Sequence, residues 1–516
     1  MAACAALEGC ASGTTTGSGG SGGTGGREPL GCPFDENAPP PPPTCPTKDP
    51  DQQGASAGCV FYPVDTNPSA GGELAAGAGD FAIVVTNVDT VASAEVVIDE
   101  NTSEGWMSVP DGTFTLGPRS VETRTFDHRQ WAGSGIHPGA YRIRSDRPIQ
   151  AYQFNPLHGQ GTKLSDASLL LPAWAFDTHY IAAAWPRTPA DYDGADDWPA
   201  NLQIVAHEPT RVTVRTPVAT SSSDAFPEVA PDEPTTFCLE EGEYLQLTAP
   251  ERMDSLNGSF ITADKPLGVF SSNDCANVPA LTAEACCCDH LEEQLFGLSR
   301  WGTRYVAARV PMREGMDGMA PPGIDGSPAI WQIMAQDDGT TVQLDATSAV
   351  TGLPGGSVVL QAREMVQVEV SGTADEPGDF FLEADKPIFV TQYMVGARYD
   401  PFEGGGDLGD PSMIVTVPVE QYLRDYVVLV PSTWLFDFLV IVRQQGAEVS
   451  LDGAPVDTTW APAGASGYEV TRVAVDDGVH AIASPVPLGV TVVGYDWADS
   501  YGYPGGLAQR PINPIY

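Results

Sequence analysis

Short stretches of alternating apolar and polar residues, bounded by Gly, Asp and Pro, recur along the whole chain. Stretches of β-branched and aromatic residues between turn-forming residues are typical of β-strands. The longest apolar stretch, residues 426–442 (YVVLVPSTWLFDFLVIV), contains Pro431 and Asp437. A membrane-spanning helix needs about 20 apolar residues and tolerates a buried Asp poorly. We therefore interpret this stretch as two buried strands and a turn, and predict an all-β protein.

One short block recurs four times at long intervals. Each copy follows a Gly-containing turn and a short strand, and carries a Pro near the head of a strand, where no ladder N–H is needed. The copies read SDRPIQAYQF (145–154), ADKPLGVFSS (263–272), ADKPIFVTQY (384–393) and SPVPLGVTVV (484–493). Because D-[RK]-P-[IL] recurs in three of them after a similar turn, the pattern indicates internal repetition.

Other blocks recur in the same order around the Pro block. One is a strand, a polar turn and a second strand; another begins with Tyr in three copies; a third is a strand in the middle of the copy. The first block begins at Phe81, Leu202, Trp331 and Leu439. The second begins at Tyr180, Tyr305 and Tyr426, with CVFYP near Cys59 as a degenerate version. The third begins at Glu243 and Glu364.

These blocks divide the body of the chain into four related β-rich repeats. Their approximate bounds are 59–165, 166–285, 286–400 and 401–516, with about six or seven strands in each. An immunoglobulin-sized sandwich has about seven strands in ~100 residues, whereas a propeller blade has four strands in ~40–50 residues. The size of the repeat favours sandwich-like units. A closed, propeller-like ring of four units, or sheets shared between repeats, is the alternative.

Residues 1–58 have a different composition from the repeats. A Gly/Ser/Thr-rich stretch is followed by a Pro run, and such sequences form a flexible coil and a stiff spacer. The start, MAACAALEGC, lacks the basic residues and the apolar run of a complete signal peptide. Its last four residues loosely resemble the end of a bacterial lipoprotein signal, in which the Cys is lipidated. We expect a disordered tether with a signal remnant and Cys10 as the lipidation candidate; the alternative is a disordered N-terminus without lipid.

The ten cysteines favour an oxidising compartment, and hence an extracellular protein. If Cys4 is removed and Cys10 is lipidated, an even number remains. The remaining disulfide candidates are Cys32, Cys45, Cys59, Cys238, Cys275, Cys286, Cys287 and Cys288. Adjacent cysteines rarely bond to each other, so the triplet needs partners elsewhere. One of many arrangements joins Cys32 to Cys45 and leaves Cys59, Cys238 and Cys275 for the triplet.

Charge restricts the partners and the cofactors. With 68 Asp and Glu against 25 Lys and Arg, the net charge is −43, which repels nucleic acid and anionic membrane surfaces. We expect no nucleic-acid partner, and contact with a membrane only through a lipid anchor. Acidic Gly-containing loops can supply oxygen ligands to calcium, and Asp407 and Asp410 are weak candidates for Ca²⁺. Solvated turns are the alternative, and no other cofactor is expected.

Motifs that announce catalysis are absent from the sequence. There is no G-x-S-x-G elbow, no H-E-x-x-H, no P-loop and no dinucleotide fingerprint. The run from Cys286 to His290 contains zinc-ligating residue types, but structural zinc sites space their thiolates as C-x₂₋₄-C, so disulfides are favoured. A glycosidase needs only two carboxylates, which an acidic chain always supplies. We expect no enzyme, with a carbohydrate-active hydrolase as the alternative.

Three longer stretches resemble a known family. They are residues 272–306 (SNDCANVPALTAEACCCDHLEEQLFGLSRWGTRYV), 409–428 (GDPSMIVTVPVEQYLRDYVV) and 494–507 (GYDWADSYGYPGGL). Together with the Pro blocks, they make the chain from about Cys59 to Tyr516 similar to the IgGFc-binding protein N-terminal domain family of animal mucus proteins and bacterial secreted proteins. The resemblance implies an extracellular, disulfide-bonded, non-catalytic β module for binding or adhesion. It does not imply that this chain binds antibody.

The sequence thus predicts an acidic, secreted, lipid-tethered β-repeat protein on the outer cell surface. Its expected partner is an extracellular glycan or protein, contacted through exposed loops. Two alternatives belong to other classes: the hydrolase, with two carboxylates in a cleft between repeats, and a purely structural component of the envelope.

Overall fold

The structure is a computed structural model that describes part of the chain. The described residues are 32, 56–66, 80–129, 131–157, 164–187, 198–223, 226–280, 288–313, 328–397 and 408–515. Of the predicted tether, residues 1–58, the structure describes residue 32 and residues 56–58, and Cys10, Cys45, Cys286, Cys287 and Asp407 lie outside the described residues. Within them the protein is built of β-strands, and its helical segments are three short 3₁₀ turns, η2 (Ala173–Ala175), η3 (Leu298–Arg300) and η4 (Val419–Gln421). The all-β prediction is confirmed.

Each of four units is organised around one long strand that carries the Pro block. These strands are β7 (Tyr141–Asn155), β14 (Phe260–Ala276), β21 (Phe380–Tyr393) and β29 (Gly478–Asp496). In unit 3 the first half of β21 pairs with β16 (Gly302–Ala307) and β18 (Thr340–Ala346), and its second half pairs with β17 (Ala329–Ala335) and β22 (Met413–Val415). All of these pairings are antiparallel, and units 1, 2 and 4 repeat the plan.

The remaining strands complete the four sheets. Unit 1 adds β1 (Gly58–Phe61), β2 (Phe81–Asn87), β3 (Ala94–Thr102), β4 (Gly105–Leu116), β5 (Val121–Phe126) and β8 (Asp166–Leu169). Unit 2 adds β6 (Gly135–Pro138), β9 (Asp177–Ile181), β10 (Ala200–Ala206), β11 (Thr210–Arg215), β12 (Thr235–Leu239), β13 (Glu243–Thr248) and β15 (Asp289–Gln294). Unit 3 adds β19 (Ser357–Leu360) and β20 (Met365–Val370). Unit 4 adds β23 (Leu423–Val430), β24 (Phe436–Gln444), β25 (Ser450–Leu451), β26 (Ala454–Pro455), β27 (Ala461–Pro462), β28 (Tyr468–Val475) and β30 (Asp499–Pro504).

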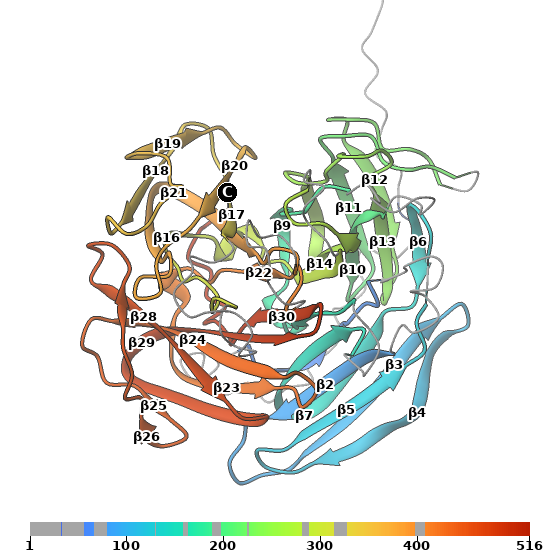
Figure 1. The fold of residues 1–516 in the computed structure, drawn as a ribbon. Coiled ribbons are helices and arrows are strands. Elements are labelled where there is room, and N and C mark those ends of the chain that lie inside the picture. Colours follow the sequence, from blue (N-terminus) through green and yellow to red (C-terminus); the bar gives the residue numbers. More distant parts are fainter. Residues whose placement is uncertain are drawn as a thin grey trace, which may run out of the picture.

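The four curled sheets are arranged around a common centre (Figure 1). Each sheet contributes its innermost strand, and these strands contact one another in the cyclic order β8, β15, β22, β30. Unit 1 therefore packs against both unit 2 and unit 4. The prediction of four tandem β-rich repeats is confirmed, and the inner strands close the repeats into a ring.

The repeated Tyr has the same role in three units. In unit 3 the Tyr305 hydroxyl donates to the carbonyl of Ile388 at 2.6 Å and accepts the main-chain N–H of Gly302 at 3.2 Å. Between Gly302 and Arg304 the pairing of β16 with β21 shifts register, so the hydroxyl bridges the irregular point. In unit 2 the Tyr180 hydroxyl bridges the main-chain groups of Asp177 and Leu267 in the same way. In unit 4 the Tyr426 hydroxyl bridges those of Leu423 and Leu488.

The Asp of the repeated D-[RK]-P fastens the start of a neighbouring strand. Asp385 accepts the main-chain N–H of Thr341, the second residue of β18, at 2.8 Å. Asp146 and Asp264 do the same for Glu95 and Arg211, each also at 2.8 Å. The repeated Asp and Tyr therefore recur because each satisfies main-chain groups that the bend of the long strand leaves out of the ladder.

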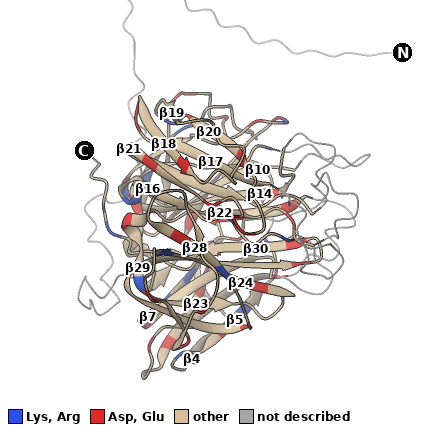
Figure 2. Ribbon diagram, turned by 60° about the vertical axis from the view of Figure 1, so that its left-hand side comes forward, with Lys and Arg blue, Asp and Glu red and all other residues tan. Residues whose placement is uncertain are grey.

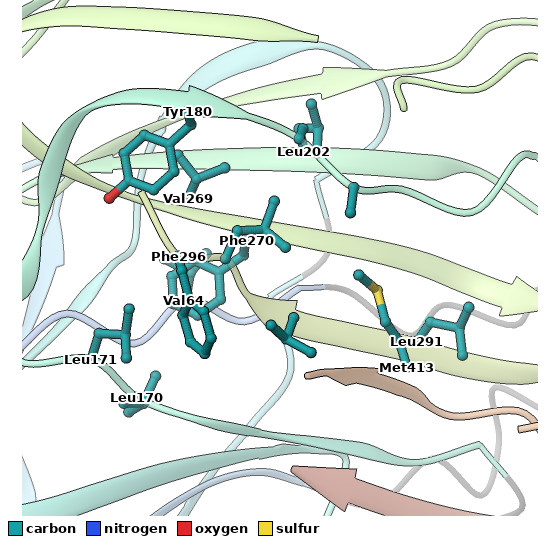
Figure 3. Packing of buried hydrophobic residues seen from close by; sticks show 14 of the residues in the cluster. Val64, Leu170, Leu171, Tyr180, Leu202, Val269, Phe270, Leu291, Phe296 and Met413 are labelled. Carbon is teal, nitrogen blue, oxygen red and sulfur yellow. The ribbon is translucent and has the colours of Figure 1, made fainter. Parts of the chain in front are cut away.

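Apolar side chains fill the space between sheets as well as the interior of each unit. Figure 3 shows Phe270 and Phe296 of unit 2 close to Val64 of unit 1, with Met413 of unit 3 near Leu291. A separate apolar cluster joins units 1 and 4, where Tyr152 contacts Tyr503 with ring centroids 5.1 Å apart. Burial of these faces supplies the main attraction between the units.

Two disulfides are described. Cys32 bonds Cys238, and Cys275 bonds Cys288; Cys59 is also disulfide-bonded. The arrangement that joined Cys32 to Cys45 is therefore wrong. Cys238 lies on β12, which ends the sheet of unit 2, so residue 32 is joined to a strand far along the chain. Cys275 and Cys288 flank the last register pair of β14 and β15, Ala276 with Asp289, which places the two sulfurs within bonding distance.

Acidic residues are distributed over all four units, with fewer basic residues between them (Figure 2). No helix among the described residues has the length and apolar content to cross a bilayer.

Candidate functional site

The four innermost strands bring four aspartates to the centre of the ring. Asp166, Asp289, Asp410 and Asp499 stand at or just before the starts of β8, β15, β22 and β30, and all four are buried at 0% exposure. They form a further repeat, DASL, DHLE, DPSM and DSYG, that the sequence analysis missed. A signal was present, because an Asp precedes each short strand, but one shared residue type is too little to identify it.

The buried carboxyl groups of the inner strands and their hydrogen-bond partners form a junction at the centre of the ring, which we call the axial junction. Asp166 joins three units within it. Its Oδ1 accepts the Ser412 hydroxyl at 2.8 Å, and its Oδ2 accepts the main-chain N–H groups of Glu292 at 3.1 Å and Met413 at 3.0 Å. The N–H of Ala167, at 2.9 Å, completes the set. One carboxylate of unit 1 thus bonds the inner strands of units 2 and 3.

Two glutamates of β15 extend the junction on either side. Glu293 accepts the N–H of Val415 at 3.2 Å and the hydroxyl of Ser168 at 3.0 Å. Glu292 accepts the hydroxyl of Thr66 at 2.6 Å and the amide of Gln153 at 2.8 Å. Each glutamate therefore ties unit 2 to a neighbouring unit through groups that are buried and hydrogen-bonded, as buried polar groups must be.

Burial controls the protonation of this junction. Desolvation raises the pKa values of Asp166 and Glu293 well above the ordinary carboxyl range, and their hydrogen bonds offset only part of the effect. The pKa of Asp289 is also raised, first by burial and then by the nearby carboxylates of Asp499, Asp410 and Asp166. Its Oδ2 is buried without a hydrogen-bond partner among the described residues. A neutral acid suits such a position.

Three residues that the sequence singled out, Cys288, His290 and Asp410, lie in or near this junction, whereas the Cys32–Cys238 disulfide lies at the outer strand β12. His290 lies within β15, where its Nε2 is 3.0 Å from the hydroxyl of Thr66, and Cys288 is in the disulfide just before that strand. Asp410 is buried at the centre rather than exposed on an acidic loop. No three or more His, Cys, Asp or Glu side chains of the described residues are placed to hold a metal ion together. The calcium hypothesis for Asp407 and Asp410 stays a prediction.

A binding function needs accessible surface, and the axial carboxylates are sealed from solvent. Two open grooves lie elsewhere. One of about 540 Å³ is on unit 4, lined by residues that include Arg443, Glu448 and Pro485. The other, of about 460 Å³, lies in the seam between units 2 and 3, with Met253 and Gln367 on opposite sides. Both linings mix apolar and polar side chains, as ligand-contacting surfaces do.

Comparison with known proteins places the chain in a family. A family model described as IgGFc binding protein matches residues 166–494, more than half of the chain. The human protein named IgGFc-binding protein is 25% identical over 271 residues, which are 50% of this chain and 4% of that protein. The chain therefore spans only a small part of the relative that it matches. The matched region includes Tyr180, Tyr305 and Tyr426, whose hydroxyls bridge the irregular points of the long strands and which we call the clasp tyrosines. It also includes the seam between units 2 and 3.

Proposed function

The chain belongs to the IgGFc binding protein family, and we propose that it is a non-catalytic extracellular protein that binds a macromolecular partner through its surface. The observation that carries the proposal is the family match over residues 166–494. The relative's name describes a protein that binds another protein. A protein ligand is therefore the partner class that we propose for this chain, with glycan attached to such a protein as a secondary contact.

Disulfides support the extracellular setting. All five cysteines among the described residues, Cys32, Cys59, Cys238, Cys275 and Cys288, are bonded, and disulfides persist in oxidising compartments. We further propose that the protein is displayed on the cell surface through a lipid on Cys10. An N-terminal peptide that carries the mass of a diacylglycerol on Cys10 is the expected finding, and an unmodified thiol there would contradict the anchor.

The binding proposal is tested on the purified, oxidised chain. It is immobilised and exposed to a mucin glycoprotein, to the same glycoprotein after enzymatic deglycosylation, and to an isolated immunoglobulin Fc fragment. We expect binding to the glycoprotein that persists after deglycosylation, and none to Fc. Loss of binding on deglycosylation would replace the protein ligand with a glycan. Absence of binding throughout would overturn the proposal, and release of reducing sugar from a polysaccharide would then favour a hydrolase.

A further inference from the structure

The seam between units 1 and 2 is filled by a segment of unit 1 that pairs with the sheet of unit 2. The connection between β5 and β7, residues 127–140, crosses to unit 2, and its strand β6 pairs antiparallel with β13. In this pairing Gly135 lies opposite Gln246, and His137 lies opposite Tyr244. The chain thus contains an example of strand addition to the edge of one of its own sheets.

A glutamine pair holds the added segment by its main chain. The Gln246 amide donates to the carbonyl of Trp131 at 2.8 Å and to that of Gly133 at 2.9 Å. Its own oxygen accepts the Gln203 amide, from the adjacent strand β10, at 3.3 Å. Both glutamines are buried, at 1% and 0% exposure. Because the bonds go to main-chain carbonyls, this grip depends little on the side chains of the bound segment.

At the seam between units 3 and 4, an arginine occupies the position that Gln246 has in unit 2. Arg472 on β28 lies opposite Val440 on β24, as Gln246 lies opposite Gln203. Its guanidinium donates to the carbonyl of Arg309 at 2.8 Å and also bonds Asp379. At this position a donor side chain therefore again holds the main chain of the preceding unit.

The seam between units 2 and 3 has the glutamine pair and an open groove. Gln332 on β17 lies opposite Gln367 on β20, and its amide donates to the Gln367 oxygen at 3.3 Å, as in unit 2. The connection of unit 2 that corresponds to residues 127–140 is 249–259, which is shorter and forms no strand on β20. Residues of this connection, Met253 and Asn257 among them, line the groove instead.

Two polar groups in this groove lack the partners that their counterparts have. Gln367 is exposed, whereas Gln246 is covered by the segment that it binds. Gln332 is 3% exposed, and its Oε1 is buried without a hydrogen-bond partner among the described residues. In unit 2 the counterpart oxygen, on Gln203, accepts the Ser272 hydroxyl of β14 at 3.2 Å. An unpartnered buried carbonyl costs free energy, so the Gln332 oxygen is available to a donor that enters the groove.

The edge of β20 is oriented to receive such a peptide. In Figure 1 β20 is on the side of unit 3 that faces unit 2, and it is the last strand on that side of its sheet. Just past its end, Ser371 exchanges main-chain bonds with Thr351 on the side away from β17. Main-chain groups alternate in direction along a strand. The N–H and C=O groups of Met365 and Gln367 therefore point away from β17, as those of Ser371 do.

We propose that this groove binds an extended peptide segment of a protein partner, added antiparallel to β20. The Gln367 amide donates to main-chain carbonyls of the peptide, as the Gln246 amide does within the chain. The residue opposite Gln367 is small, as Gly135 is opposite Gln246, and apolar side chains of the peptide contact Met253 and Met365. The inference rests on the proposed function, since it names where and how a protein ligand is held.

The test uses the segment that the chain itself binds in the equivalent seam. A fluorescent peptide of residues 129–138 (RQWAGSGIHP) is titrated with the full chain, and binding is followed by polarisation. We expect saturable binding that Gln367→Ala weakens about tenfold or more. Gln343→Ala, which removes an exposed glutamine on β18 of the same unit, should leave binding unchanged. A peptide N-methylated along its backbone should not bind, because strand addition needs its N–H groups.

Equal binding by the parent chain and Gln367→Ala, or by the two peptides, would overturn the assignment, as would no binding at millimolar concentration. A thermal melt of each variant confirms that the chain is folded. The mucin experiment separates the two proposals. If the glycoprotein binds Gln367→Ala as well as it binds the parent chain, the proposed function stands and the groove is not its site. If the glycoprotein does not bind while the peptide does, the proposed function fails and the groove assignment stands.

Discussion

Asp166 of unit 1 accepts the main-chain N–H of Met413 of unit 3 at 3.0 Å, across the centre of the ring. The same oxygen accepts the N–H of Glu292 of unit 2. Three sheets that are distant in sequence therefore meet on one buried carboxyl group. The junction fixes the relative positions of the units through directional bonds, which apolar packing alone does not provide.

Replacement of this carboxyl by a carboxamide is expected to destabilise the whole ring. In Asp166→Asn, an NH₂ group must either face the two N–H groups that Oδ2 now accepts or turn toward the Ser412 hydroxyl. Because at least one buried group loses its partner, we expect a loss of about 2–4 kcal/mol in the free energy of unfolding. Urea denaturation measures this loss. Asp146→Asn, at an exposed position that bonds one N–H, is the control and should cost less.

Stability is expected to fall as the pH rises through the weakly acidic range. Burial raises the pKa of Asp437 to about 6 and raises those of Asp166, Asp289 and Glu293. The folded chain keeps these protons where the unfolded chain, with carboxyl pKa values near ~4, has lost them. Their contribution is therefore present at about pH 4 and is lost as the pH passes the folded values.

Urea unfolding at several pH values and constant high ionic strength, which screens the net charge, checks this dependence. Asp437→Asn keeps an oxygen that can accept the Tyr501 hydroxyl bond but cannot ionise. This substitution should remove part of the fall in the free energy of unfolding between about pH 4 and pH 6, a part worth at most about 3 kcal/mol. A free energy of unfolding that rises steadily from pH 4.5 to pH 7.5 would contradict the prediction.

The clasp tyrosines offer a test of the bend in the long strands. Tyr305→Phe removes the hydroxyl that joins Gly302 to Ile388 and leaves the ring in place. Phe61 lies at the corresponding position of unit 1, so the aromatic side chain itself is compatible with the site. We expect a loss of about 1–3 kcal/mol, since a buried carbonyl and a buried N–H lose their partner. Tyr468→Phe, on a partly exposed ring, should change the denaturation midpoint little; equal effects would argue against the clasp.

The disulfides predict a defined peptide map. Proteolysis without reduction should give one linked pair that contains Cys32 and Cys238 and another that contains Cys275 and Cys288. Thiol labelling of the native chain should leave these four cysteines unmodified, and labelling after denaturation and reduction should modify all of them. A linked Cys32–Cys45 peptide would contradict the structure.

Much of the fold follows from the sequence because its repeated residues perform local tasks. D-[RK]-P and the Tyr block recur where a main-chain group near the bend needs a partner, so a search for self-similarity locates the long strands of all four units. The closure of the ring does not follow in this way. It depends on Asp166, Glu293 and Met413, which come from three units and contact one another only after each sheet has formed.

The groove between units 2 and 3 was also hidden from the sequence. The correspondence of the strands that begin near Glu243 and Glu364 is visible in the sequence, and it contains Gln246 and Gln367 at equal positions. Their different surroundings come from the connections 127–140 and 249–259, of which only the longer forms a strand. Which connection reaches a neighbouring edge is decided by the curvature and spacing of the sheets.

The position of β30 in the ring has a consequence for biogenesis. This strand consists of residues 499–504, yet it packs against β8 of unit 1 and β22 of unit 3. During synthesis, the sheet of unit 1 is complete more than 300 residues before this neighbouring strand is made. The apolar face that Tyr152 and Phe154 contribute to this contact stays uncovered until then, and transiently exposed apolar surface of this kind makes an unfinished chain prone to aggregate.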